Sequence, residues 1–450
     1  MPPGWEDDPD LQITAFSQLP HRHFGTNQHL RINEDFRESL RQILWQFKAP
    51  IRYAFAYGSG VFSQTGGSGD GLSPHPHPPE AVRKWQQGGG KIIDFIFGVT
   101  YTQHWHSINI QQHPQHYSAL RHLGSYAVSK VQDSWGAGVY FNPYITVNGT
   151  MIKYGVVNLD TICEDLSEWD TLYLAGRLQK PVKILRDEPR VRLANQINLM
   201  SAVRTALLML PEKFTEKQLY ERIAGISYLG DPRMSLGAEN MRKVSNIVSN
   251  QLPNFRQVYV PLIDNLPNVD FTDRRVPREP GWEKEEVIAV SKRPAEHALG
   301  GVDGFSMQQD MDPVRRGNMV RRLPKDFRKK LYYQYRKKFH IPGSAFDKIV
   351  DEATDEDATG FHRRQGGEFE QRIGTQADLS DIVQKCIRNT IAWPSTSQSI
   401  KGIFTSGFSR SWQYYQDKRS KNRQGKDQKE GGIEQPKSTQ GQSNDRLKKE

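Results

Sequence analysis

Cysteine is scarce in this sequence, and long apolar runs are missing from it. The two cysteines, Cys163 and Cys386, lie far apart in the chain. Two separated thiols argue against a disulfide scaffold and against a structural zinc site, and they fit a reducing compartment. No run reaches the roughly 20 apolar residues of a membrane-spanning helix, so we expect no transmembrane segment.

The first residues show no targeting signal, and acidic residues are in deficit. Residues 1–10 are acidic and resemble neither a secretory signal nor an Arg-rich mitochondrial presequence. Lysine and arginine outnumber aspartate and glutamate by 61 to 51, which gives a net charge of +10 and a pI of about 9.3. This excess predicts a polyanionic partner, which is a nucleic acid, a nucleotide or an anionic membrane.

The most informative feature is a pair of segments with the composition of strands. Residues 52–62 (RYAFAYGSGVF) predict an apolar, aromatic strand that runs into a Gly-Ser-Gly turn. Residues 91–99 (KIIDFIFGV) predict a second strand with one carboxylate, Asp94, in its middle. Aspartate is depleted in strands. A carboxylate between apolar neighbours is costly unless a cation or hydrogen bonds hold it.

A Gly-Ser turn after one strand and an aspartate inside the next are typical of nucleotidyltransferases. Gly58 and Gly60 let the backbone approach phosphate oxygens, and the Ser59 hydroxyl can donate a hydrogen bond to them. Asp94 is the candidate Mg²⁺ ligand. The plainer alternatives are an ordinary tight turn and a buried aspartate that caps a loop.

The usual Asp-x-Asp or Asp-x-Glu pattern is incomplete, because Ile96 stands where the second carboxylate is expected. A second metal ligand must then come from elsewhere, or one metal suffices. The next carboxylates after a strand are Asp160, Glu164 and Asp165, and they are the candidates for that ligand.

Basic residues near these motifs are candidate phosphate contacts. Lys153 lies in the strand MIKYGVV, and Arg177, Lys180 and Lys183 crowd the stretch GRLQKPVK. A lysine in a β-branched strand is commonly an edge charge that faces water, and a basic cluster is commonly a solvated face. The functional interpretation is that these side chains neutralise a triphosphate or bind a phosphate group of the second substrate.

The order of elements predicts an α+β fold. Two β-rich runs in residues 136–158 flank Asn148-Gly149, a strong hairpin signal, and the later part of the chain reads as short helices with a capping box at Thr215 and Gln218. We therefore expect a nucleotidyltransferase-type mixed sheet with flanking helices, followed by a small winged-helix-like helical domain and a basic membrane-contacting C-terminal region. The predicted boundaries are a flexible N-terminus (1–30), the nucleotidyltransferase domain (31–190) with a disordered insertion (63–90), the winged-helix-like domain (191–262), a linker (263–312), the basic amphipathic C-terminal region (313–412) and a disordered tail (413–450).

Residues 314–339 carry the strongest charge feature of the chain. Apolar residues recur there every four positions, between clusters of basic side chains. A basic amphipathic helix of this kind suits an anionic membrane surface, to which each Lys or Arg contributes about 1 kcal/mol. The alternatives are a helix packed on the domain with a solvated basic face, and nucleic-acid binding. The predicted membrane contacts are Phe327, Leu331, Tyr335, Phe339, Lys329, Lys330, Arg336 and Lys337.

Several long strings in the chain carry a family resemblance. They are YAFAYGSGVF, IDFIFGV, GAGVYFNPYITVNGTMIKYGVV, YLAGRLQKPVKIL, IAGISYLGDPRM and KGIFTSG, within residues 50–250 and 394–407. They resemble the Tam41 family, the mitochondrial CDP-diacylglycerol synthases. The resemblance implies that CTP and phosphatidic acid react to CDP-diacylglycerol and pyrophosphate with Mg²⁺, in the route to cardiolipin. It also implies a peripheral protein on anionic lipids at the matrix side of the inner mitochondrial membrane, with no nucleic-acid partner.

The resemblance also implies roles for individual residues. Gly58 and Ser59 would cradle the CTP phosphates, and Asp94 would bind Mg²⁺. The basic residues of the strand MIKYGVV and of the stretch GRLQKPVK would contact the triphosphate or phosphatidate. Asp231 and Arg233, in the string GDPRM, would complete the site from the second domain.

Two other functions stay open from the residues alone. The basic charge and the winged-helix-like region permit a nucleotidyltransferase that acts on RNA, although no RNA-binding signature such as RRM or KH is visible. The family's older name, translocator assembly and maintenance protein, suggests a non-enzymatic assembly factor for mitochondrial protein import. An intact Asp94 and Gly-Ser-Gly turn argue against a scaffold of that kind.

Overall fold

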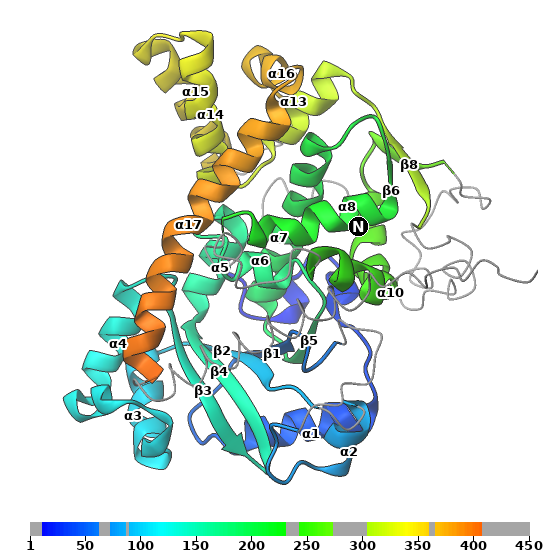
Figure 1. Cartoon of the computed structure of the whole chain (residues 1–450). Helices are drawn as coiled ribbons and strands as arrows, with labels where there is room; N and C mark the ends of the chain where they lie inside the picture. Colours follow the sequence, from blue (N-terminus) through cyan, green and yellow to red (C-terminus); the bar gives the residue numbers. More distant parts are fainter. Residues whose placement is uncertain are drawn as a thin grey trace, which may run out of the picture.

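A computed structural model describes residues 11–62, 73–86, 90–230, 243–272, 304–359 and 365–406. A mixed five-stranded sheet and a smaller three-stranded sheet are surrounded by helices (Figure 1). The predicted α+β class with a mixed sheet is confirmed.

The five-stranded sheet is built from the two motif strands and the predicted hairpin. Its strands are β1 (Tyr53–Tyr57), β2 (Ile93–Val99), β3 (Val139–Val147), β4 (Thr150–Asn158) and β5 (Val182–Arg186). They lie in the order β3-β4-β2-β1-β5, with β2 and β4 parallel and the other pairs antiparallel. Asn148 and Gly149 have φ angles of 47° and 69°, as a tight turn between two strands requires. The hairpin prediction is therefore confirmed.

Helices cover both faces of this sheet. On one face, the ring of Phe47 lies 5.2 Å from that of Phe97 and 5.1 Å from that of Tyr154. On the other face Gly98 leaves room for the side chains of α5, because a Cβ at this position would lie 3.0 Å from Ile162. The helices of this unit are α1 (Glu34–Trp45), α2 (Glu80–Trp85), α3 (Thr102–Gln112), α4 (Gly124–Ser134), α5 (Leu159–Glu168), α6 (Ala175–Leu178) and α7 (Pro189–Met209).

A second unit follows α7. Its main described elements are β6 (Lys213–Thr215), α8 (Glu216–Gly225), α10 (Lys243–Ile263), β7 (Val269–Phe271) and β8 (Ser306–Gln309). The capping box of Thr215 and Gln218 starts α8, as expected. The strands form an antiparallel sheet in the order β6-β8-β7. The prediction that residues 263–312 form a linker is therefore wrong near both ends. Residues 269–271 and 306–309 lie in this range and form the strands β7 and β8.

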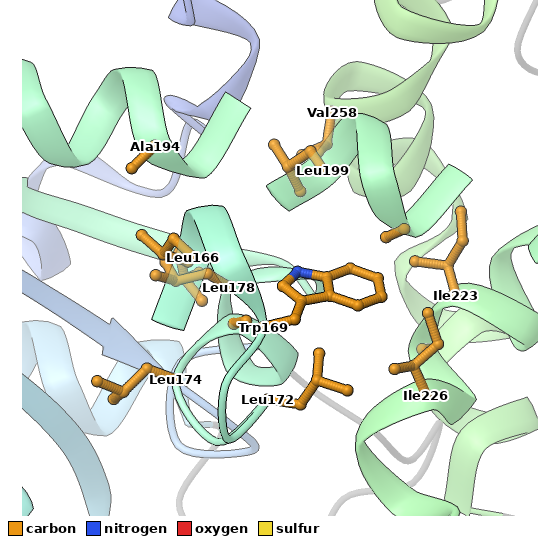
Figure 2. Close-up of a cluster of buried hydrophobic side chains, with 14 of the residues drawn as sticks. Leu166, Trp169, Leu172, Leu174, Leu178, Ala194, Leu199, Ile223, Ile226 and Val258 are labelled. Carbon is orange, nitrogen blue, oxygen red and sulfur yellow. The ribbon is translucent and has the colours of Figure 1, made fainter. Parts of the chain in front are cut away.

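The two units share one hydrophobic core. Figure 2 shows Trp169 among side chains from both of them, including Leu199 of α7 and Ile223 of α8. Trp169 is fully buried, and its indole Nε1 donates to the Asn198 side chain at 2.9 Å. It sits just after α5 with φ at 58°, a left-handed conformation that a bulky residue adopts only when its surroundings hold it. The packing of the junction thus determines the backbone conformation at this point.

The C-terminal region is helical and packs on both units. Its helices are α13 (Pro313–Arg321), α14 (Lys325–Phe339), α15 (Gly343–Thr359), α16 (Glu368–Gly374) and α17 (Leu379–Ser406). Figure 1 shows α17 as a long orange helix that runs from α16 toward α4 and β3. The amide of Gln398 donates to the Val139 carbonyl at 2.9 Å, and the ammonium of Lys401 donates to the Gln132 carbonyl at 3.1 Å. No helix in the described part of the chain is long and apolar enough to cross a membrane.

The apolar stripe of α14 faces the protein and not its surroundings. Phe327, Leu331 and Tyr335 are fully buried, and the Phe327 ring lies 5.4 Å from that of Trp169. Phe339 is partly buried against Phe369, at a ring distance of 6.1 Å. The prediction that this stripe contacts a membrane is wrong, because its apolar surface is already used by the fold. The alternative prediction, a helix packed on the domain, is correct. The basic side chains on this helix stay at least partly exposed: Lys329, Lys330, Arg336 and Lys337.

Two further expectations of disorder differ from the structure. Within the expected flexible N-terminus, Ile13, Leu19 and Phe24 are buried against Leu193 of α7. Within the expected insertion at 63–90, residues 73–86 include α2, which buries Val82 completely. Apolar anchors therefore fix both segments despite their polar composition. The expected tail at 413–450 lies outside the described residues.

A buried ion pair holds the second unit together. Arg256 of α10 donates to both carboxylate oxygens of Glu216, at 2.9 and 2.7 Å, and the Tyr220 hydroxyl donates to the same carboxylate at 2.9 Å. The backbone N–H of Phe305, next to β8, donates to it at 3.3 Å. One carboxylate thus connects α8, α10 and the start of β8.

We expect Glu216→Gln to lower the free energy of unfolding by about 3–5 kcal/mol, because the guanidinium of Arg256 would stay buried without its counter-charge. Urea unfolding at fixed pH measures the loss. The matched control is Glu80→Gln, which breaks an exposed pair with Lys84 on α2 and should leave stability nearly unchanged. Equal stability of the two variants would contradict a structural role for the buried pair.

Candidate active site

Three side chains lie in one row across the centre of the sheet. In the strand register, Tyr57 of β1 is opposite Asp94 of β2, and Asp94 is opposite Lys153 of β4. Residues opposite each other in a sheet point to the same face. The Lys153 ammonium lies 4.0 Å from Asp94 Oδ1, and the two side chains keep 22% and 31% of their exposure. This half-buried pair lies on the face of the sheet that α5 covers at Gly98, and it is accessible to solvent.

The Gly-Ser-Gly turn folds back over the start of β2. Gly58 has φ at 80°, and its carbonyl accepts hydrogen bonds from the backbone N–H groups of Val61 and Phe62 at 3.1 and 2.9 Å. A Cβ on Gly60 would lie 2.6 Å from the Ile92 carbonyl oxygen, closer than any side chain tolerates. Glycine is required at both positions, for the left-handed backbone and for the close approach.

The turn lies directly beside the carboxylate. A Cβ at Gly58 would be 3.4 Å from Asp94 Oδ2, so the turn backbone and the Asp94 side chain border the same space. An ordinary tight turn after a strand needs no such neighbour. The structure therefore brings together Gly58, Ser59, Gly60, Asp94 and Lys153, whose individual roles stay predictions.

Arg177 joins this group through Tyr57. Its Nε donates to the Tyr57 hydroxyl at 3.4 Å, and its guanidinium lies 3.9 Å from the centre of the Tyr173 ring. Burial, followed by the charge of Asp94, raises the pKa of Tyr57, while the charges of Arg177 and Lys153 oppose this shift. The Tyr57 hydroxyl accordingly stays protonated at neutral pH. Nothing in the sequence pattern singled out Tyr57 or Tyr173, because their roles arise from contacts between distant segments.

Asp165 has a structural function and is not available to a metal ion. Its carboxylate accepts hydrogen bonds from the backbone N–H groups of Thr171, Leu174 and Ala175 and from the Thr171 hydroxyl, at 2.7 to 2.9 Å. These bonds hold the segment that leads into α6, and so position Arg177. Asp160 is on the surface, paired with Arg190 at 2.8 Å.

The basic side chains of the stretch that contains Arg177 do not all lie on the Tyr57 face of the sheet. Lys180 donates to the Ser227 hydroxyl at 2.7 Å, near the second unit. Lys183 is opposite Ala56 in the sheet, one residue out of step with Tyr57, so it points to the other face. There it donates to the Leu30 carbonyl at 2.6 Å, and burial lowers the pKa of Lys183 to about 8. The grouping of Lys183 with the phosphate contacts is therefore wrong.

Two of the predicted site residues, Asp231 and Arg233, lie outside the described residues. Among the residues described, no three His, Cys, Asp or Glu side chains converge as a metal cage. Mg²⁺ does not need one, because it is commonly bound by one or two carboxylates together with substrate phosphates and water. The partly exposed Asp94 carboxylate beside a glycine turn fits that mode of binding.

Comparison with known proteins identifies the family. The Tam41 family model, described as mitochondrial phosphatidate cytidylyltransferase, matches residues 40–421. The chain belongs to this family. Family membership was predicted from the sequence strings and is confirmed.

The relatives extend over most of the chain. The chain is 36% identical to the mitochondrial phosphatidate cytidylyltransferase of Schizosaccharomyces pombe over 388 residues, which cover 86% of this chain and 84% of that protein. It is 45% identical to the Saccharomyces cerevisiae protein of the same name over 55% of this chain and 60% of the relative. The Xenopus laevis protein, also of that name, is 33% identical over 83% of this chain and 91% of its own length.

We expect Gly60→Ala to lower the free energy of unfolding by about 1–3 kcal/mol, because the new methyl group would collide with the Ile92 carbonyl and force the turn away from β2. Chemical unfolding measures this change. Gly225→Ala is the control, since Gly225 ends α8 with an ordinary helical φ of −67° and open space around its Cβ position; it should be neutral or stabilising by up to about 1 kcal/mol. If both variants unfold alike, the close contact at Gly60 is absent in solution.

Proposed function

We propose that this protein is a phosphatidate cytidylyltransferase, which converts CTP and phosphatidic acid to CDP-diacylglycerol and pyrophosphate. The observation that carries the proposal is the family match over residues 40–421, a range that includes the whole row of Tyr57, Asp94 and Lys153. The curated relatives bear this activity in their names. We place the product in the route to cardiolipin and phosphatidylglycerol.

The residues beside Asp94 suit the binding of a nucleoside triphosphate. The backbone N–H groups of the turn at 58–60 and the Ser59 hydroxyl would hold phosphate oxygens. Lys153 and Arg177 would neutralise the charge that accumulates as pyrophosphate departs. The protonated hydroxyl of Tyr57 would keep Arg177 directed at the same space. Mg²⁺, when bound, supplies further neutralisation of phosphate charge, and Asp94 is the residue that would hold it.

The reaction needs positioning more than proton transfer. A phosphate oxygen of phosphatidate attacks the α-phosphorus of CTP, and the bond between the α-phosphorus and the bridging oxygen to the β-phosphate breaks as pyrophosphate leaves. The attacking phosphate is already ionised at neutral pH, because its second pKa lies near 6. A strong general base is therefore not required, and the rate depends on alignment and on charge neutralisation.

The second unit supports the winged-helix-like assignment. Among the residues described, the α-helices and strands from α7 to β8 follow in the order helix, strand, helix, helix, strand, strand. The strand between the first two of these helices, β6, pairs with β8. This order supports a winged-helix-like unit, in which β7 and β8 would form the wing. In this family member the unit would face the lipid substrate and not a nucleic acid, and the comparisons give no support to RNA as the acceptor.

We place the membrane contact on the end of α17. Trp393, Ile400 and Phe404 are 71%, 43% and 63% exposed, and their spacing of seven and four residues puts them on one side of the helix. The exposed cations Lys385 and Arg388 precede them on the same helix. An anionic bilayer is the occupant that matches this surface, because the acceptor lipid is embedded there. The inner mitochondrial membrane, at its matrix side, is the compartment that we propose.

Pyrophosphate release tests the activity and the role of Asp94 together. The full-length protein is incubated with phosphatidate vesicles and each of the four NTPs, with Mg²⁺ or with EDTA. We expect pyrophosphate release from the vesicle mixtures only when both CTP and Mg²⁺ are present. The rate of release should decrease by about 10²-fold or more in Asp94→Asn, since several kcal/mol of charge stabilisation would be lost.

The control for this experiment is Asp35→Asn, an exposed carboxylate on α1, which should keep full activity. Release that requires RNA instead of lipid would favour the RNA-directed alternative. No release with any NTP, while the protein still binds vesicles, would favour the assembly factor. Full activity of Asp94→Asn would remove Asp94 from the metal site.

Vesicle flotation tests the surface on α17. The double variant Trp393→Ser, Phe404→Ser should bind anionic vesicles at least about tenfold more weakly, because burial of each large apolar side chain contributes about 1.5–3 kcal/mol. Trp45→Ser removes another exposed tryptophan, on α1, and should bind like the unmodified protein. Equal losses in both variants would mean that α17 has no special part in binding.

A further inference from the structure

Exposed large apolar side chains gather on α17 and on the neighbouring segment of α3 and α4. Of the eleven such side chains in the described part of the chain, four lie on α17, and three lie between the residue before α3 and the first turn of α4. These three are Tyr101, Leu123 and Tyr126, which are 73%, 71% and 65% exposed. The proposed active site uses none of them.

The end of α17 is built into the nucleotidyltransferase unit. The Lys401 side chain is fully buried, and its amino group donates to the backbone carbonyls of Gln132 and Trp135 at the end of α4. The ring of Trp135 lies 5.8 Å from that of Phe404, one of the exposed side chains of α17. These contacts hold the last turns of α17 against α4, so its exposed apolar side is a fixed part of the surface of this unit.

The start of α3 reaches the same place. The hydroxyl of Thr102 donates to the Asp133 carboxylate at 2.7 Å, one residue from the Gln132 carbonyl that Lys401 binds. Tyr101 directly precedes Thr102 and therefore lies close to the point where α17 and α4 meet. Figure 1 shows α3 and α4 together beside the lower end of α17.

One side of α4 adds to this surface. Leu123, just before the helix, and Tyr126 and Lys130 on it are spaced by three and four residues, which puts them on one side. All three are exposed, whereas Val128 and Gln132 are buried. The outer side of a surface helix is commonly polar, and a patch of exposed apolar side chains marks an interaction site.

Both segments lack carboxylates. Residues 101–132 and residues 382–406 contain no aspartate or glutamate, although these two types supply 51 of the 450 residues of the chain. The exposed cations of the two segments include Lys130, Lys385 and Arg388. A second copy of the chain on this surface would bring like charges together. An anionic bilayer would instead match the cations and bury the apolar side chains.

We propose that Tyr101, Leu123, Tyr126 and Lys130 form a second half of the membrane-binding surface, continuous with α17, and that one anionic bilayer covers both halves. This inference rests on the proposed function, which places α17 on the membrane. Because α17 is fixed to α4 and α4 to α3, contact through both halves holds the nucleotidyltransferase unit in one orientation on the bilayer. A fixed orientation favours the reaction, since the acceptor phosphate must reach the site beside Asp94 from that bilayer.

Flotation of the full-length protein with vesicles tests this second half of the surface. The vesicles contain phosphatidylcholine mixed with phosphatidylglycerol, or phosphatidylcholine alone. The double variant Leu123→Ser, Tyr126→Ser should bind the anionic vesicles at least about tenfold more weakly, and Tyr101→Ser at least about threefold, because apolar side chains no longer enter the bilayer. Lys130→Glu should weaken binding to the anionic vesicles about tenfold and leave binding to the neutral vesicles unchanged, since only the anionic surface attracts the cation.

The matched controls are Met311→Ser and Lys213→Glu, which change exposed side chains next to β8 and on β6. Figure 1 shows these strands on the opposite side of the molecule from α3 and α4, and both controls should bind like the unmodified protein. Urea unfolding should give the same midpoint for every variant, because exposed side chains contribute little to stability. Lys130→Glu keeps the test valid if a serine variant is unstable.

Two results would overturn the proposal. The first is binding to anionic vesicles that stays unchanged in every variant of the second half while the α17 variant loses it. The second is a loss of self-association in sedimentation, without a loss of flotation, which would make a second copy of the chain the occupant. Failure of the unmodified protein to release pyrophosphate is a distinct result: it would reject the proposed activity, while flotation would still decide the surface.

Discussion

The register of β2 against its two neighbours is the constraint on which the site depends. β2 pairs antiparallel with β1 and parallel with β4, so Asp94 is fixed from both sides. Phe95 and Phe97 are fully buried in the sheet, and a slip by one residue would exchange them with Asp94. The burial of these aromatic rings therefore keeps the carboxylate on the accessible face, beside Tyr57 and Lys153.

The packing between units determines the rest of the site. Asp165 holds the segment before α6 through backbone hydrogen bonds, and Trp169 fills the core between α5, α7 and α14. Arg177 and Lys180 sit on the segment that these two residues hold in place. A change in the core around Trp169 would consequently move Arg177 and Lys180, the proposed phosphate contacts, without touching either side chain.

The helix α14 illustrates what an amphipathic pattern cannot distinguish. Apolar residues every four positions among basic ones indicate a helix with one apolar side, whether that side meets lipid or protein. In this molecule the stripe of Phe327, Leu331 and Tyr335 meets the core. Exposed large apolar side chains gather instead on α17, at Trp393, Ile400, Ile403 and Phe404, where the sequence pattern is less regular.

Local sequence alone determined the strands, the Gly-Ser-Gly turn, the hairpin at Asn148-Gly149, the capping box at Thr215 and the choice of Asp94, because each depends on neighbouring residues or on a short period. Tertiary structure decided which candidates share a face. Lys183 is separated from Asp94 by the alternation of β5 against β1, and Asp165 is occupied by backbone N–H groups that only the folded loop presents. Likewise, the contacts of Tyr57 with Arg177 and of Lys401 with the Gln132 carbonyl join segments far apart in the chain. Such pairings arise from strand register and domain packing, which no local pattern encodes.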